Sequence, residues 1–123
     1  MMSKTKECVA LSILEREEIV SVGESATCIK DVILWFGPNP DSREVKVRIS
    51  NKPNDLTGND IFSLILPEYN ILGTINKEFI TDDVLSSIIE YIEFNKENIY
   101  NYSIFAADGS ICAGNFILAL KTK

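Results

Sequence analysis

Histidine is absent from this chain of 123 residues. Its absence excludes Ser-His-Asp and Cys-His catalytic arrangements, the common His-containing zinc sites, and the side chain best suited to proton transfer near neutral pH. The glycine-rich loops G-x-x-x-x-G-K-[ST] and G-x-G-x-x-G are missing as well, so no motif indicates a nucleotide site. We therefore expect no bound cofactor or metal.

Long apolar runs are also lacking. No stretch approaches the roughly 20 apolar residues that a membrane helix needs, and no apolar run precedes Val9, as it would in a secretory signal. The three cysteines, Cys8, Cys28 and Cys112, are odd in number and widely spaced, which fits neither a disulfide framework nor a C-x-x-C site. We expect reduced, partly buried thiols in a cytoplasmic protein that does not contact membranes.

Acidic residues outnumber basic ones, 18 to 12, for a formal net charge of −6. This sign repels phosphate backbones and argues against nucleic acid as the main partner. A protein partner, if there is one, should therefore be basic.

Residues 81–98 show the clearest periodicity in the chain. At about 100° per residue they separate into an apolar arc and an acidic arc, which is typical of an amphipathic helix with one buried side. Thr81 is a suitable N-cap, and Asp82 and Asp83 lie where the helix dipole favours negative charge. The apolar arc contains Val84, Leu85, Ile88, Ile89, Tyr91 and Ile92; the opposite arc contains Asp82, Asp83, Ser86, Glu90, Glu93 and Glu97.

Several other segments have the composition of β-strands. Residues 44–50 alternate strictly, so Val45, Val47 and Ile49 should face inward. Residues 38–43 have turn chemistry, and the buried run 31–36 before them should form a hairpin with 44–50. Residues 61–66 fit a strand or a short helix, and Pro67 soon after favours a strand. The other expected strands are 7–14, 19–22, which the loop 23–27 follows, and 70–80, either regular or with a bulge at Gly73.

The dipeptide Asp108-Gly109 predicts a two-residue type I′ turn between residues 100–107 and 111–121. In such a hairpin Phe105 faces Cys112, and Phe116, Leu118 and Leu120 share the face that meets the helix. The fold class expected from all these segments is α+β: a single domain, residues 1–123, with a mostly antiparallel sheet of about five to seven strands and one principal helix packed on one face. Strands adjacent in sequence should be neighbours in the sheet.

Carboxylate pairs are the remaining source of catalysis, and each has a simpler explanation. Asp82 and Asp83 splay apart at a helix start, while Asp55 and Asp60 lack EF-hand spacing. The cluster Glu15, Glu17 and Glu18 resembles a solvated turn, and Gly23-Glu24-Ser25-Ala26 lacks the second glycine of a nucleophile elbow. We expect no catalytic residues, and so no enzyme.

The acidic side of the 81–98 helix is the main candidate for a functional surface. It carries no Lys or Arg between Asp82 and Glu93, so it accumulates like charge without the i,i+4 ion pairs that stabilise an exposed helix. Phe94 falls beside it, and an exposed aromatic among charges is typical of a protein-binding hot spot. The predicted partner-binding residues are Asp83, Glu90, Glu93, Phe94 and Glu97.

In size, charge and lack of catalytic groups the chain resembles the immunity proteins of polymorphic or contact-dependent toxin systems, and also the anti-defence inhibitors of phages. The resemblance implies a small inhibitor that neutralises a basic bacterial toxin, such as a nuclease, by direct binding through an acidic surface that imitates phosphates. Two alternatives stay open. One is a homodimeric chaperone or adaptor for a secreted effector that accepts a client strand at an edge formed by 44–50. The other is a small-ligand module with Tyr91, Tyr100 and Tyr102 around a pocket.

Overall fold

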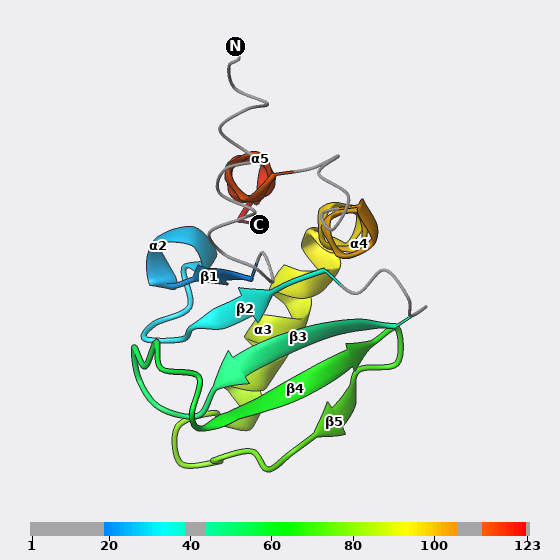
Figure 1. The fold of residues 1–123 in the computed structure, drawn as a ribbon. Helices are drawn as coiled ribbons and strands as arrows, with labels where there is room; N and C mark the ends of the chain where they lie inside the picture. The colour runs from blue at the N-terminus through cyan, green and yellow to red at the C-terminus, as the bar shows by residue number, and fades with distance from the viewer. Residues whose placement is uncertain (1–18, 39–43, 106–111, 123) are drawn as a thin grey trace.

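The computed structural model describes residues 19–38, 44–105 and 112–122 (Figure 1). Five strands and four helices follow one another in these segments. The strands are β1 (Val20–Val22), β2 (Leu34–Phe36), β3 (Val45–Ser50), β4 (Ile61–Leu66) and β5 (Asn70–Leu72), and the helices are α2 (Glu24–Thr27), α3 (Asp82–Phe94), α4 (Lys96–Phe105) and α5 (Ala113–Ala119).

The sheet has the order β1-β2-β3-β4-β5, and every neighbouring pair is antiparallel. The predicted α+β class is therefore confirmed, as are the adjacency of consecutive strands and the strand at 61–66. The predicted edge strand is wrong: β3 lies between β2 and β4, so its backbone groups are already paired and it offers no free edge to a client.

One face of the sheet forms the core together with the helices. The alternation in β3 directs Val45, Val47 and Ile49 to this face, as predicted, and all three are buried. The α3 side chains Ile88 and Ile92 are fully buried in the same cluster. Figure 1 shows α3 running behind the sheet, so its apolar arc covers the sheet and its acidic arc faces away.

The predicted helix 81–98 is two helices. Its start is confirmed: Thr81 Oγ1 accepts a hydrogen bond from the Val84 N–H at 3.3 Å. The helix ends at Phe94, however, and the buried Asn95 separates it from α4, which begins at Lys96. The Asn95 side chain donates to the Tyr91 carbonyl at 3.0 Å, a local bond that competes with continuation of the helix.

The predicted hairpin at 100–107 and 111–121 is wrong, because the described parts of both arms are helical. The aromatic and branched residues there favour strands by composition, but burial follows a helical period. In α4 the buried residues are Ile99, Tyr102 and Ser103, spaced as i, i+3 and i+4. The dipeptide Asp108-Gly109 lies outside the described residues.

Phe116 shows why these helices form. Its fully buried ring stacks on Tyr102 of α4, with centroids 4.4 Å apart, and meets Phe36 of β2 edge-on at 5.3 Å. One ring on α5 thus ties α4 to the sheet. The predicted shared face of Phe116, Leu118 and Leu120 does not exist, since Leu118 is 81% exposed.

Smaller differences concern element boundaries. The predicted loop at 23–27 contains the one-turn helix α2. The strand predicted at 31–36 is regular only over Leu34–Phe36, although all three residues are buried as expected. The strand predicted at 70–80 ends at Leu72. Gly73 follows with φ +98°, a left-handed conformation that favours glycine. The strand predicted at 7–14 lies outside the described residues.

The cysteines differ from expectation. Cys112 is disulfide-bonded, whereas Cys28 is a free, exposed thiol. The prediction that all cysteines are reduced is therefore wrong for Cys112. Because disulfides persist mainly in oxidising compartments, the cysteines no longer support a cytoplasmic location.

Among the residues described, none of the helices combines the length and apolar character that crossing a membrane would require.

Candidate functional site

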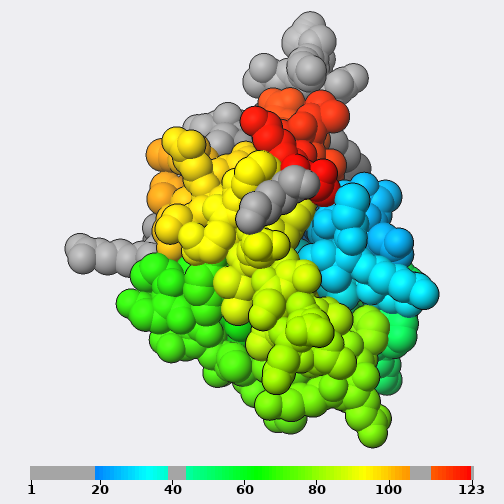
Figure 2. Space-filling model, turned by 180° about the vertical axis from the view of Figure 1, so that it is seen from behind, coloured from blue at the N-terminus to red at the C-terminus, as the bar shows by residue number. Residues whose placement is uncertain are grey.

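The exposed side of α3 places most of the predicted partner-binding residues on one surface. We call the acidic face the set of exposed α3 residues, which are Asp82, Asp83, Ser86, Ser87, Glu90, Glu93 and Phe94. Figure 2 shows this side of the molecule, with α3 passing between the segment that precedes it and the N-terminal part of the described chain. The apolar arc of the helix is held against the sheet, so the acidic face has a fixed orientation.

Four residues of the acidic face form a single row along the helix. Asp83, Ser87, Glu90 and Phe94 follow one another at intervals of four, three and four residues, which places their side chains above one another. Phe94 is 48% exposed, so the aromatic ring at the end of the row is accessible to a partner.

Glu93 belongs to the acidic face but has partners of its own. It accepts a short hydrogen bond from the Tyr69 hydroxyl, and its carboxylate lies 3.6 Å from the Lys96 ammonium. Burial raises the pKa of Tyr69 above its ordinary range, and the hydrogen bond to Glu93 adds to the effect. Glu93 therefore connects α3 to the turn after β4. We assign it a structural role within the acidic face.

Glu97 is exposed but lies on the first turn of α4. The interruption at Asn95 means that Glu97 does not continue the row on α3. The structure thus groups Asp83, Glu90, Glu93 and Phe94 on one helix and leaves Glu97 on the next.

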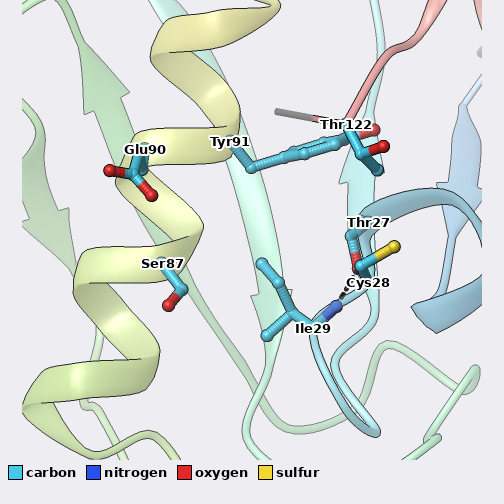
Figure 3. Close-up of a pocket in the computed structure, with 7 residues that line it drawn as sticks. All are labelled: Thr27, Cys28, Ile29, Ser87, Glu90, Tyr91 and Thr122. Atoms are coloured by element: carbon cyan, nitrogen blue, oxygen red, sulfur yellow. Dashed lines mark hydrogen bonds between the residues drawn. The ribbon is translucent and has the colours of Figure 1, made fainter.

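A hollow of about 220 Å³ lies beside this row (Figure 3). Three of its lining residues come from α3 and three from the end of α2 and the turn that follows; one belongs to the C-terminal segment. They are Ser87, Glu90 and Tyr91, then Thr27, Cys28 and Ile29, and finally Thr122. The lining is rich in hydroxyl groups, and its one charged residue is a carboxylate.

The Tyr91 side chain is the unusual group in this lining. Figure 3 shows its ring extending from α3 toward Thr122, above Thr27 and Cys28. The residue is 5% exposed, and its hydroxyl makes no hydrogen bond to any part of the chain that the structure describes. Burial raises the pKa of Tyr91 to about 12, with a smaller contribution from Cys28. A buried hydroxyl without a partner costs about 1–3 kcal/mol, so this group needs an explanation.

Local backbone geometry forms the wall opposite α3. The one-turn helix α2 ends at Thr27, and the C-cap residue Cys28 has a left-handed conformation with φ +62°. Thr27 Oγ1 accepts the Ile29 N–H at 3.0 Å (Figure 3). This bond occupies the Thr27 oxygen and fixes the turn that carries the wall.

Thr122 reaches the hollow because Asn95 holds the residue before it. The Asn95 side chain donates to the Lys121 carbonyl at 2.8 Å and accepts the Lys121 N–H at 2.8 Å. The sequence placed Tyr91 in the apolar arc of the helix and in the small-ligand alternative, and it did not connect Tyr91 with Thr27, Cys28 or Thr122. Residues so far apart in sequence carried no pattern that connected them.

Of the other carboxylates considered for chemistry, Asp55 and Asp60 have local hydrogen-bond partners, and Glu15, Glu17 and Glu18 lie outside the described residues. Asp55 accepts the Thr57 N–H at 2.9 Å and the Thr57 hydroxyl at 2.7 Å, and these two bonds lower its pKa. Asp60 accepts from the Asn51 side-chain amide at 3.0 Å. Within residues 19–38, 44–105 and 112–122, no group of His, Cys, Asp or Glu is arranged to hold a metal ion.

A second hollow, of about 270 Å³, lies on the opposite face of the sheet. Trp35 and Arg48, which are directly paired across β2 and β3, line it together with Ile61 and the loop residues Thr57 and Gly58. Trp35, at 9% exposure, is thus a nearly buried residue of the outer face rather than of the main core. This hollow faces away from α3 and shares no residue with the first.

Protein-family models, curated proteins and solved structures were all compared with this chain, and none of them matches it.

Proposed function

We propose that this protein is a binding inhibitor, of the immunity-protein kind, that neutralises a basic bacterial toxin domain such as a nuclease. The acidic face of α3 is the surface that makes the contact. The observation that carries the proposal is the row Asp83, Ser87, Glu90 and Phe94, which combines accessible carboxylates with an accessible aromatic ring on a rigid helix.

The charge of this region supports attraction to a basic partner. Residues 78–105 contain six carboxylates and a single cationic residue, Lys96. Lys96 lies next to Glu93, so its positive charge offsets that of the Glu93 carboxylate at the end of α3. Such an excess of one sign accelerates diffusional encounter with a surface of the opposite sign and disfavours wrong partners.

Phe94 supports an anchoring role. Charged residues at the rim of an interface contribute mainly to encounter, whereas aromatic residues that become desolvated contribute most of the binding energy. Nearly half of the Phe94 side chain is accessible although the core lies directly beneath α3. Covering this ring gives a partner an apolar anchor beside the carboxylates.

The test is binding and inhibition of the basic toxin domains encoded next to this protein's gene. The variant Asp83→Asn/Glu90→Gln removes two charges of the acidic face and keeps the shapes of the side chains. Its matched control, Glu44→Gln/Asp55→Asn, removes two charges from the β3 start and from the loop between β3 and β4. The first variant should weaken binding roughly tenfold or more, as expected for charge pairs at an interface, and the control should change it little.

Equal effects of the two double variants would show that only net charge matters and that the acidic face is not the site. The absence of binding to every neighbouring basic toxin domain, with the protein folded, would contradict the function itself.

A further inference from the structure

We propose that the second hollow, on the outer face of the sheet, binds a small organic carboxylate that carries an apolar group. The residues that hold it are Trp35 and Arg48, which are paired across β2 and β3, with Ile19 and Ile61 beside them. This site shares no residue with the acidic face of α3, so it is independent of the proposed function and goes beyond it.

The second hollow lies on a side of the sheet that no described helix covers. Figure 1 shows α3 behind the sheet, so that the outward side chains of β3 and β4 are turned toward the viewer. The volume of about 270 Å³ is close to the lower limit of about 300 Å³ for small-molecule pockets. Gly58 contributes bare backbone to the lining, and a side chain there would meet nothing within 4 Å. The hollow is therefore open to a small ligand.

Two hydrogen-bond donors in the lining have no acceptor in the described part of the chain. The Arg48 guanidinium makes no ion pair or hydrogen bond there, and the Trp35 indole N–H makes no hydrogen bond. Both groups donate only, and the N–H of a mostly buried tryptophan usually has a partner. The Trp35 nitrogen is not sealed inside the protein, because among the described residues the Tyr91 hydroxyl is the one buried side-chain polar atom without a partner. The hollow thus offers accessible donors to a ligand that accepts.

The charge around the hollow selects an anion. Arg48 is the one charged residue among the described residues that line it. The carboxylates of the neighbouring loop are engaged locally: Asp55 accepts two hydrogen bonds from Thr57. Asp60 accepts one from Asn51, and neither carboxylate forms an ion pair with Arg48. A cation in the hollow would be repelled by the guanidinium, whereas an anion is attracted by it.

The remaining walls specify the rest of the ligand. The Ile19 and Ile61 side chains and the indole ring are apolar, and small-molecule sites typically combine apolar walls with a few polar groups that fix orientation. The guanidinium fork matches the two oxygens of a carboxylate. A carboxylate carries the single charge that one arginine balances, whereas a phosphate monoester carries about −1.5 to −2 at pH 7. We therefore assign the hollow to a carboxylate whose apolar group covers the ring and the isoleucines.

Trp35 makes the hollow directly observable, because it is the only tryptophan in the chain. Its fluorescence and its indole N–H resonance are followed while the probe 3-phenylpropanoate is added to the folded protein. The controls are 3-phenylpropanamide, which lacks the charge, and acetate and inorganic phosphate, which lack the apolar group. 3-Phenylpropanoate should change both signals saturably and bind roughly tenfold or more tightly than each control, because only the probe combines the charge-assisted bond with burial of apolar surface.

Arg48→Gln is the key variant, since it removes the cation and keeps a polar side chain on β3. Lys46→Gln is the matched control: Lys46 lies two residues earlier on the same face of β3, has no ion pair among the described residues and does not line the hollow. Arg48→Gln should weaken binding of 3-phenylpropanoate roughly tenfold or more, and Lys46→Gln should change it little. Arg48→Lys keeps the charge without the fork and should lie between them. Amide resonances outside the hollow verify that each variant is folded.

Four results would overturn the assignment, and the first three need no variant. No saturable change with 3-phenylpropanoate would mean that the hollow is not a carboxylate site. Equal binding of 3-phenylpropanamide would show that charge is not recognised, and equal binding of acetate or phosphate would show that the apolar walls take no part. Equal losses in Arg48→Gln and Lys46→Gln would show that the ligand responds to net charge alone. None of these measurements involves a toxin domain, so their failure leaves the proposed function of the acidic face unaffected.

Discussion

Asn95 and Lys121 are joined by two hydrogen bonds of 2.8 Å each, one from the Asn95 side-chain amide to the Lys121 carbonyl and one from the Lys121 N–H to the Asn95 side-chain oxygen. The Asn95 side-chain amide thus pairs with the backbone of the C-terminal segment in the way that a backbone amide of a β-strand would. At the same time it donates to the Tyr91 carbonyl at 3.0 Å. A single buried side chain thus ends α3, separates it from α4 and positions Thr122 beside the hollow.

Asn95→Ala should lower the free energy of unfolding by about 2–3 kcal/mol, because it removes the three hydrogen bonds that the side chain makes to the Tyr91 carbonyl and to the Lys121 carbonyl and N–H. Urea denaturation measures the loss. Asn98→Ala is the matched control: within the described part of the chain its side chain makes one bond, to the Phe116 carbonyl at 3.2 Å, so it should cost about 1 kcal/mol. Equal losses in the two variants would contradict the assigned role of Asn95.

Phe116→Ala should cost about 3–5 kcal/mol, the usual range for removing a fully buried aromatic ring. The ring touches both Tyr102 and Phe36, so its loss separates α4 and α5 from the sheet. Leu118→Ala should change stability by no more than about 0.5 kcal/mol, because this side chain is 81% exposed. Thermal unfolding of the two variants also tests whether this segment is helical. In the predicted hairpin Phe116 and Leu118 would share the buried face, so both substitutions would lower the stability.

Asn51 makes a second buried polar connection, and Asn51→Ala should cost about 2–3 kcal/mol. Its side chain donates to Asp60 at 3.0 Å and to the Thr74 carbonyl at 2.9 Å, and accepts the Asn76 N–H at 2.9 Å. These bonds hold the segment that leads into α3. Asn59→Ala, at an exposed position of the same loop, should stay within about 0.5 kcal/mol of the unmodified protein in urea denaturation.

The raised pKa of Tyr91 makes stability depend on pH at the alkaline end. The pKa is 10.0 in the unfolded chain and about 12 in the folded protein, so between these values the unfolded state loses its proton first. Folding stability contributed by this group is complete below pH 10 and falls as the pH rises toward 12, by about 2–3 kcal/mol in all. Unfolding free energies measured at neutral pH and near pH 12 should therefore show a smaller alkaline loss for Tyr91→Phe than for the unmodified protein. An identical loss in the two proteins would mean that Tyr91 is not held neutral by burial.

The sequence predicted those parts of the fold in which one period dominates. Strict alternation in 44–50 located β3 and its buried side, and the helical period after Thr81 located α3 and its acidic face. Prediction failed for the described residues 100–105 and 112–121, where branched and aromatic residues favour strands locally. Ile99 and Tyr102 are buried at helical spacing in α4, and Phe116 is the buried residue of α5. Tertiary packing of one ring against two elements decided that region, and no local pattern contains this information.

The candidate site was likewise predictable where its residues follow the period of one helix. Asp83, Glu90 and Phe94 follow from the period of one helix. At the break after Phe94, the Asn95 side chain bonds both to the nearby Tyr91 carbonyl and to a residue 26 positions away. That break moves Glu97 off the row. The hollow could not be foreseen, since it exists only where Thr27, Tyr91 and Thr122 are brought together by folding.

The two kinds of residue on the acidic face should affect binding kinetics in different ways. Long-range attraction between charges is screened by salt within about 8–10 Å at 0.1–0.15 M ionic strength, so Asp83→Asn should mainly lower the association rate and flatten its dependence on salt. Phe94→Ala should mainly raise the dissociation rate, by roughly tenfold or more, because a covered aromatic anchor stabilises the complex only after encounter. Stopped-flow association and dissociation measurements with a toxin domain found to bind this protein, at low and high salt, separate the two effects. Leu56→Ala provides the control for Phe94, since Leu56 is another exposed apolar residue, at 65%, in the loop between β3 and β4. If Leu56→Ala raised the dissociation rate as much as Phe94→Ala, the partner would bind elsewhere than on α3.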